Sequence, residues 1–256
     1  MKLAVICFTR TGVNWCGHLV KRFRESGTEC EGYVPPRFFE ETAEKQPGLN
    51  PQKELLKEWT RRQFEKADGL IFIGAAGIAV RAIAPFVHDK LTDPAVVVMD
   101  EAGRYAVSLL SGHVGGANGL ARMVAEFCGA EPVITTATDV NKKTAIDVWA
   151  SKRELVIGER EQIKQVAAAF LEDRPVGFFS DFDLQEEAPE GCVRKVAGES
   201  NIWLTIRTTP EPQDAILREL AGQGKVLRLI PRILTVGIGC RRGIAKEQIG
   251  QLAEQI

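Results

Sequence analysis

The sequence predicts an α/β protein with a mostly parallel N-terminal sheet flanked by helices and a second, smaller α/β domain. Apolar segments of strand length alternate with segments of helical period, a pattern typical of βα units. The chain has 256 residues, and at roughly 150 residues per domain this length predicts two domains. Hydrophobic residues make up 45% and charged residues 26% of the chain, which is the composition of a globular protein rather than a disordered one.

Charge and cysteine usage argue against several classes of protein. The formal net charge is −1, whereas nucleic-acid-binding and membrane-surface proteins usually carry a basic excess. The six cysteines are widely spaced and form no C-x-x-C pair, so we expect reduced thiols and no protein-built metal site. The first residues contain no signal-peptide cleavage site, and no apolar run is long enough to span a bilayer, so we expect a cytoplasmic protein.

The N-terminal domain is expected to contain five strands, each a short apolar segment. They span residues 3–8, 70–74, 95–99, 105–110 and 132–136. Asn50 and Pro51 predict the start of a helix, because an N-cap residue often precedes a proline at the first helical position. That helix is expected to carry Leu55, Leu56 and Trp59 on one face.

A further helix is expected at residues 119–128, because its apolar residues recur at the spacing of a helix packed on a sheet. These residues are Leu120, Met123, Val124, Phe127 and Cys128. Gly129 is expected to end the helix.

A second domain is expected after residue 139, where the sequence becomes polar. It begins with a helix whose apolar face is Ile163, Val166, Ala167, Phe170 and Leu171. Strands are expected at 175–180, 201–206 and 225–230. The predicted domains are therefore 1–139 and 140–231. A strand at 232–240 and a helix at 245–256 cannot bury a core by themselves, so residues 232–256 are expected to start an incomplete C-terminal domain or to dock on the preceding one.

The segment with the most chemical information is residues 111–118, SGHVGGAN, which connects a strand to the helix at 119–128. Glycine lets a backbone approach a ligand closely, and free N–H groups at a helix N-terminus favour an anion. The alternative is a tight turn that binds nothing. Ser111 and His113 favour a site, because open α/β sheets bind ligands at the carboxyl ends of their strands.

A second glycine turn follows strand 70–74, where Gly74 and Gly77 lead into a helix that carries Arg81. The alternative is that these glycines only allow close packing of helix on strand. The chain contains no G-x-G-x-x-G motif, no P-loop and no G-x-S-x-G elbow. Dinucleotide, ATP and ordinary serine hydrolase chemistry therefore lack support.

Three weaker features remain open. Residues 100–104 predict a hairpin loop, and a catalytic carboxylate there is the less favoured alternative. The polar residues 135–139 either line the same cleft as His113 or form a strand end with a helix cap at Asp139. Six basic residues and no acidic one lie between Lys225 and Lys246, which is either a solvated linker or a patch for a polyanion.

Several blocks of the sequence resemble the cobalt-precorrin-5A hydrolases of anaerobic cobalamin biosynthesis. They are GIAVRAIAP at 77–85, DKLTDPAVVV at 89–98, SLLSGHVGGAN at 108–118 and PVITTATD at 132–139. Residues 236–243, VGIGCRRG, resemble the opening of the family's C-terminal domain, most of which we expect to be missing. The resemblance implies that the protein opens the δ-lactone of a cobalt-bound tetrapyrrole and releases acetaldehyde. The cobalt would arrive within the substrate, so no cofactor is expected.

Lactone hydrolysis needs a base for water and donors for an oxyanion. We expect His113 to be the base, Ser111 and Asn118 to orient the reacting groups, and the N–H groups of Gly115 and Gly116 to hold the oxyanion. The other candidates are glycines, hydroxyl residues and cations that suit a carboxylate ligand. They are Gly74, Gly77, Arg81, Lys90, Gly112, Thr135, Thr136, Arg241 and Arg242.

The expected ligand is a cobalt-bound polycarboxylate tetrapyrrole, and neither nucleic acid nor a membrane is expected as a partner. A separate C-terminal polypeptide, other enzymes of the pathway and a second copy of the chain are left open as protein partners. The rival function is a non-catalytic tetrapyrrole carrier, and a nucleotide-dependent transferase ranks below it.

Overall fold

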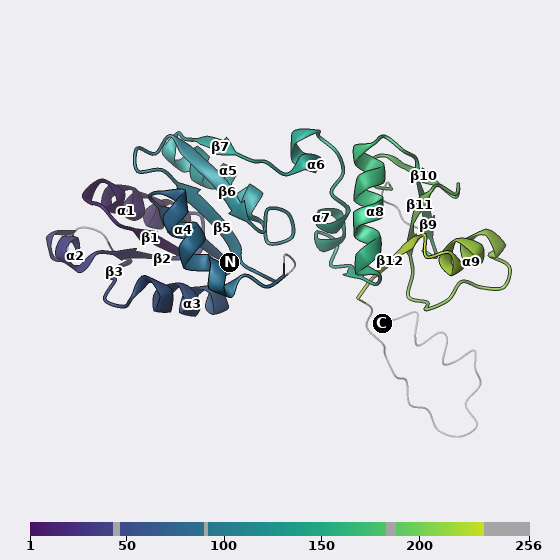
Figure 1. Ribbon diagram of the computed structural model, residues 1–256, viewed down its shortest axis with the longest axis horizontal. Helices are drawn as coiled ribbons and strands as arrows, with labels where there is room; N and C mark the ends of the chain where they lie inside the picture. Colours follow the sequence, from purple (N-terminus) through teal and green to yellow (C-terminus); the bar gives the residue numbers. More distant parts are fainter. Residues whose placement is uncertain (43–46, 90–91, 183–187, 233–256) are drawn as a thin grey trace, which may run out of the picture.

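The computed structural model describes residues 1–42, 47–89, 92–182 and 188–232, which form two sheets with helices on both faces (Figure 1). Within these residues the first sheet has seven strands in the order β3-β2-β1-β4-β5-β6-β7, and the second has five in the order β10-β9-β11-β12-β8. This architecture confirms the predicted α/β class.

The first sheet is mostly parallel, as predicted. Its strands are β1 (Lys2–Cys7), β2 (Glu29–Val34), β3 (Leu49–Pro51), β4 (Gly69–Ile73), β5 (Ala95–Met99), β6 (Tyr105–Leu110) and β7 (Glu131–Val133). Among these strands, β5 and β6 are the antiparallel neighbours, and they form the hairpin predicted at 100–104. The Asp100 carboxylate stabilises the turn, because it accepts hydrogen bonds from the N–H groups of Ala102 and Arg104.

Helices cover both faces of this sheet. α1 (Arg10–Glu25) and α5 (Ala117–Cys128) pack on one face, and α3 (Leu56–Lys66) and α4 (Ala76–Ile83) pack on the other. α2 (Pro36–Thr42) follows β2, and the 3-10 turn η1 (Ala84–Phe86) follows α4. The helix predicted at 119–128 is α5: Leu120 and Val124 are buried, and Gly129 ends the helix with φ of 68°.

The sequence did not predict β2, because Gly32 and two glutamates interrupt its apolar pattern. The glycine is nevertheless required there. A Cβ atom at residue 32 would lie 2.5 Å from Leu49 Cδ2 and 2.7 Å from Cys16 Sγ. β2 therefore packs against α1 and β3 more closely than a strand with a side chain at this position allows.

The predicted helix start at Asn50 and Pro51 is wrong. Both residues belong to β3, the edge strand of the sheet, where a proline is tolerated because no further strand needs its N–H group. The helix begins at Leu56. Leu55 precedes it and is exposed, whereas Trp59 is buried as predicted.

The two glycine turns identified in the sequence lie at opposite edges of the first sheet, where an edge now means one of the two sides at which the strands begin or end. Gly74 follows β4, which runs parallel to β5, whereas Ser111 follows β6, which runs antiparallel to β5. The end of β6 therefore lies at the edge where β4 and β5 begin. β7 runs parallel to β6, so the residues after β7 lie at the same edge as the loop at 111–118. This edge is turned toward the second sheet (Figure 1).

The strands predicted after residue 139 belong to the second sheet, and the helix predicted there packs on it. Its strands are β8 (Val156–Ile157), β9 (Val176–Ser180), β10 (Cys192–Arg194), β11 (Ser200–Leu204) and β12 (Val226–Ile230). The short helices α6 (Ala137–Val140) and α7 (Ile146–Ser151) lead from the first sheet to the second. α7 and α8 (Arg160–Leu171) cover one face, and α9 (Ala215–Gly222) covers the other.

The predicted tail elements at 232–240 and 245–256 lie outside the described residues from residue 233 onward, as do Lys90, Arg241 and Arg242. The division into domains at residues 139 and 231 stays a prediction. Within the ranges given above, no helix is long and apolar enough to cross a membrane.

Candidate functional site

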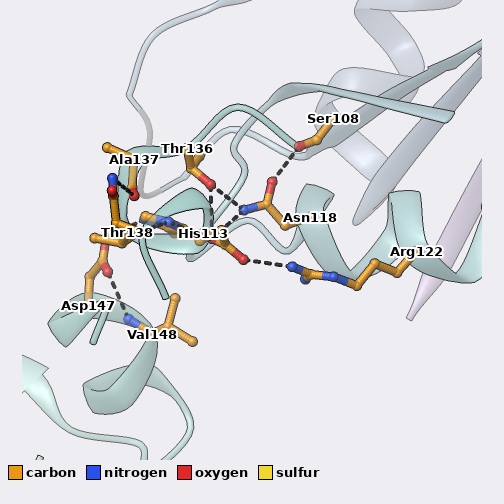
Figure 2. Close-up of polar contacts among 11 residues, drawn as sticks. Ser108, His113, Asn118, Arg122, Thr136, Ala137, Thr138, Asp147 and Val148 are labelled. Atoms are coloured by element: carbon orange, nitrogen blue, oxygen red, sulfur yellow. Dashed lines mark hydrogen bonds and ion pairs between the residues drawn. The ribbon is translucent and has the colours of Figure 1, made fainter. Parts of the chain in front are cut away.

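His113 lies in the loop between β6 and α5, and its side chain contacts residues of α6 and α7 (Figure 2). Its Nε2 atom lies 2.8 Å from Thr138 Oγ1 and 3.1 Å from Asp139 Oδ2. Its Nδ1 atom lies 3.7 Å from Asp147 Oδ2. The imidazole is therefore held between two carboxylates that come from different helices.

Asp139 connects this histidine to the surrounding elements. Its Oδ2 atom also accepts hydrogen bonds from Asn118 Nδ2 and Thr136 Oγ1, both at 2.9 Å. Its Oδ1 atom pairs with Arg122 at 2.8 Å. The buried Asn118 amide accepts a hydrogen bond from the Ser108 hydroxyl at 2.7 Å, as Figure 2 shows. The network fixes the carboxylate relative to β6 and α5.

The electrostatics favour charge on both members of the His113–Asp139 contact. The Asp147 carboxylate raises the pKa of His113 above its ordinary value, partial burial opposes this rise, and Asp139 adds to it. Burial disfavours the ionised form of Asp139, but hydrogen bonds from Arg122 and Thr136 outweigh this effect, and the pKa of Asp139 is lowered. The polar contact of the Asp147 carboxylate with the ring is the largest cause of the raised pKa of His113, and the negative charge of Asp147 adds to it.

A cleft of about 450 Å³ opens beside His113 and is large enough for part of a small organic ligand. The loop at 111–118 contributes Gly112, His113 and Gly116 to its walls. The α5 helix contributes Asn118, Gly119 and Arg122. The remaining walls come from the segment that joins the two sheets: Thr138, Asp139, Lys142, Lys143, Ala145, Val148 and Lys152.

The loop itself occupies three of the N–H groups at the N-terminus of α5, where an anion site was predicted, so these three groups are not available to an anion. Gly116 N–H donates to the carbonyl oxygen of His113 at 2.9 Å. The N–H groups of Ala117 and Asn118 donate to the Ser111 and Gly112 carbonyls, each at 3.0 Å. The Gly116 N–H is therefore not free to hold an oxyanion.

Gly115 and Ser111 also serve the internal packing of the loop. A Cβ atom at Gly115 would lie 2.3 Å from Ser111 Cβ, so the glycine is needed for contact within the protein. The Ser111 hydroxyl is buried, has no hydrogen-bond partner among the described residues and does not line the cleft. This placement does not fit the catalytic role that we expected for Ser111.

The structure brings some of the other predicted residues to His113 and separates the rest from it. Gly112, Asn118 and Thr136 lie at the site. Gly74 lies at the opposite edge of the sheet. Arg81 is exposed, and its guanidinium donates to the Gly77 carbonyl at 3.2 Å. The residues that line the cleft do not include Arg81, Gly77 or Thr135. The structure therefore does not bring Arg81 to this cleft.

Sequence reasoning missed Asp147 and Arg122, whereas Thr138 belongs to the polar run 135–139 that was considered as a lining of this cleft. Asp147 lies in an ordinary helical segment, and only the fold places its carboxylate beside His113. Asp139 was considered a helix cap or a cleft residue, and the structure supports the second of these readings. The signal available in the sequence was the polar run at 135–139, which ends a strand at the same edge as His113.

In the described parts of the chain, no group of three or more His, Cys, Asp and Glu side chains is arranged to hold a metal ion. The expectation that the protein needs no cofactor stays a prediction.

Two family models cover most of the described chain. Residues 58–139 match the model described as cobalamin synthesis G N-terminal, and residues 144–229 match that of the cobalamin biosynthesis central region. The first match includes the His113 loop and Asp139, and the second includes Asp147.

Similar proteins agree with these matches. Cobalt-precorrin-5A hydrolase of Salmonella typhimurium is 37% identical over 94% of this chain and 66% of its own length. The enzyme of the same name from Priestia megaterium is 30% identical over 98% of this chain and 68% of its own length. A crystal structure of a cobalamin biosynthesis protein G homologue from Sulfolobus solfataricus superposes with a TM-score of 0.52 at 21% identity, covering 99% of this chain and 68% of that one. The chain thus spans about two thirds of the length of these proteins.

Proposed function

The chain belongs to the cobalt-precorrin-5A hydrolase family, and on this premise we propose that it opens the δ-lactone of cobalt-precorrin-5A and releases acetaldehyde to give cobalt-precorrin-5B. The observation that carries the proposal is the placement of His113 at a cleft and between two carboxylates. The cobalt is part of the substrate, and the proposal needs no resident cofactor. We propose the cytoplasm as the place of action.

His113 acts as the general base in this proposal. In the neutral imidazole one ring nitrogen donates its N–H to a neighbouring carboxylate and the other accepts a proton from water, whose oxygen adds to the lactone carbonyl carbon. Asp139 and Asp147 stabilise the imidazolium that forms, as a carboxylate does for a catalytic histidine in hydrolases. The ring C–O bond then breaks, and the leaving oxygen takes the proton from the imidazolium. The products of this step are an alcohol and a carboxylic acid, which loses its proton to solvent. Acetaldehyde is released in a second step: the alcohol loses its O–H proton, the C–C bond between the carbinol carbon and the macrocycle breaks, and the macrocycle carbon takes up a proton.

The rival function is a non-catalytic carrier of the same tetrapyrrole. The names of the relatives favour an enzyme, and the fixed acid–base group at the cleft favours it further, because a carrier needs only contacts that bind.

An anaerobic acetaldehyde assay with the cobalt-bound lactone tests the proposal. We expect wild-type protein to release acetaldehyde and His113→Ala to lose at least about 100-fold in kcat, which is the lower range for removal of a general base. Lys57→Gln, on the exposed surface of α3, is the matched control. Substrate binding without acetaldehyde release by the wild-type protein would favour the carrier, and full activity of His113→Ala would remove His113 from the mechanism.

A further inference from the structure

The cleft beside His113 is lined by more positive than negative side chains. Arg122, Lys142, Lys143 and Lys152 line it, and Asp139 is the carboxylate among its described lining residues. The chain as a whole carries a formal net charge of −1. The positive charge is therefore a local property of this cleft.

Two of the four cationic side chains form ion pairs with carboxylates of the protein. Arg122 pairs with Asp139 at 2.8 Å, and Lys143 pairs with Asp173. Lys142 and Lys152 are exposed, and neither side chain has an ion pair or hydrogen bond with another described residue. These two ammonium groups are therefore available to a ligand in the cleft.

The backbone ties both lysines to the elements that hold the histidine. Lys142 has a left-handed conformation with φ of 53°, and its N–H group donates to the Asp139 carbonyl at 3.2 Å. Lys152 follows α7, and its N–H group donates to the Val148 carbonyl at 3.0 Å. The segment from residue 139 to 152 thus supplies the two carboxylates around His113 and the two uncommitted cations.

We infer that Lys142 and Lys152 each bind a carboxylate of the ligand, so that the cleft selects a polycarboxylate and orients it against His113. This inference rests on the proposed function and assigns part of its substrate recognition to two residues that the sequence analysis did not name. An ammonium group is a compact, hydrated point charge on a flexible stem, which suits carboxylates on mobile acetate and propionate arms. Because both groups are exposed, their attraction is screened by salt.

Binding of uroporphyrin I, a flat tetrapyrrole with eight carboxylates, tests the inference without chemistry. The variants are Lys142→Asn, Lys152→Gln and the double variant, since asparagine tolerates the left-handed backbone at residue 142. Each single variant is expected to weaken binding up to about fivefold, the upper range for one exposed ion pair, and the double variant about 20-fold. The loss should shrink at high salt, and coproporphyrin I, with four carboxylates, should bind more weakly. Lys57→Gln is again the control.

Each outcome of this titration decides for or against the inference. A double variant that binds uroporphyrin within twofold of wild type overturns it, as does a wild-type chain that does not bind uroporphyrin at low salt. An equal loss in Lys57→Gln would show that binding follows net charge alone, and would also overturn it.

The acetaldehyde assay separates this inference from the proposed function. Where the wild-type chain is active, the double variant is expected to raise KM more than it lowers kcat. An unchanged KM overturns the inference and leaves the function standing. A chain that releases no acetaldehyde, yet loses uroporphyrin binding in the double variant, refutes the function and leaves the inference standing.

Discussion

At the scale of single residues, the site depends on a histidine whose charge is set by carboxylates from two helices. His113 was predictable, because a polar residue in a glycine-rich loop after a strand has few structural uses. Asp147 was not predictable, because a single aspartate in a helix has no distinguishing neighbours in the sequence. Its role arises only when α7 is placed against the loop at 111–118.

Asp147→Asn is expected to lower the pKa of His113, because the variant keeps the shape of the side chain and replaces the carboxylate that contributes most to the raised pKa with a neutral amide. NMR titration of the His113 ring protons measures this change directly. The low-pH limb of kcat should move to lower pH in the same variant, since the neutral base is then populated at lower pH. Asp214→Asn, at the N-cap of α9, is the control, because it makes the same change in charge at a side chain that forms no capping hydrogen bond.

The opposite result would change the role of the histidine. If activity falls as pH rises through the pKa of His113, the reaction uses the imidazolium as an acid. An unchanged pKa in Asp147→Asn would show that Asp139 alone controls the charge.

At the scale of elements, the loop from β6 to α5 illustrates what a glycine pattern can and cannot predict. Three glycines within residues 112–116 correctly predicted an unusual backbone at the start of a helix. The pattern does not say whether the neighbour that approaches the glycine is a ligand or the protein. Here it is the protein, because the loop carbonyls take the helix N–H groups and Gly115 packs on Ser111.

Gly115→Ala is expected to destabilise the protein by about 1–3 kcal/mol, the usual cost of overpacking, because the added Cβ would lie 2.3 Å from Ser111 Cβ and 2.9 Å from the Ser111 carbonyl oxygen. Gly119→Ala is the matched control. It lies in α5 with no atom within 4 Å of the added Cβ, so it should stabilise by up to about 1 kcal/mol through helix propensity. Urea unfolding of both variants measures the difference, and equal free energies of unfolding would contradict the close contact in this structure.

The edge at which an element ends is also an element-scale property that the sequence did not reveal. The predicted strands at 70–74 and 105–110 are correct, yet the hairpin at 100–104 reverses the direction of β6 and β7. This single reversal moves His113 away from Gly74 and toward α7. The sequence therefore predicted which segments form strands of the sheet. The direction in which each strand runs, which the sequence did not reveal, decides which residues share a site.

At the scale of the whole molecule, the site lies where the loop of the first sheet meets the segment that leads into the second. Besides the His113–Asp147 contact, Arg160 of α8 pairs with Asp89, which follows η1, at 3.2 Å. Contacts of this kind join residues that are far apart in the sequence, and neither the periodicity of the apolar residues nor a sequence motif indicates them. The two sheets were predictable, but the side chains that join them were not.

The charge of His113 should therefore make the stability of the folded chain depend on pH. Its folded pKa is raised above the ordinary 6.5, so its protonation stabilises the fold fully below about pH 6.5, and this contribution is lost as pH rises through the folded value. Asp139 acts in the opposite direction: its folded pKa is lowered below 3.8, so its contribution is present above that pH and is lost as pH falls through the folded value. Both contributions are present together between these two limits. We expect the difference in free energy of unfolding between wild type and His113→Gln to be largest near pH 6 and to shrink toward pH 9, because glutamine carries no titrating charge.

Urea unfolding of both proteins from pH 6 to pH 9 measures this difference in free energy of unfolding. A difference that stays constant or grows toward pH 9 would show that His113 is held neutral between its two carboxylates.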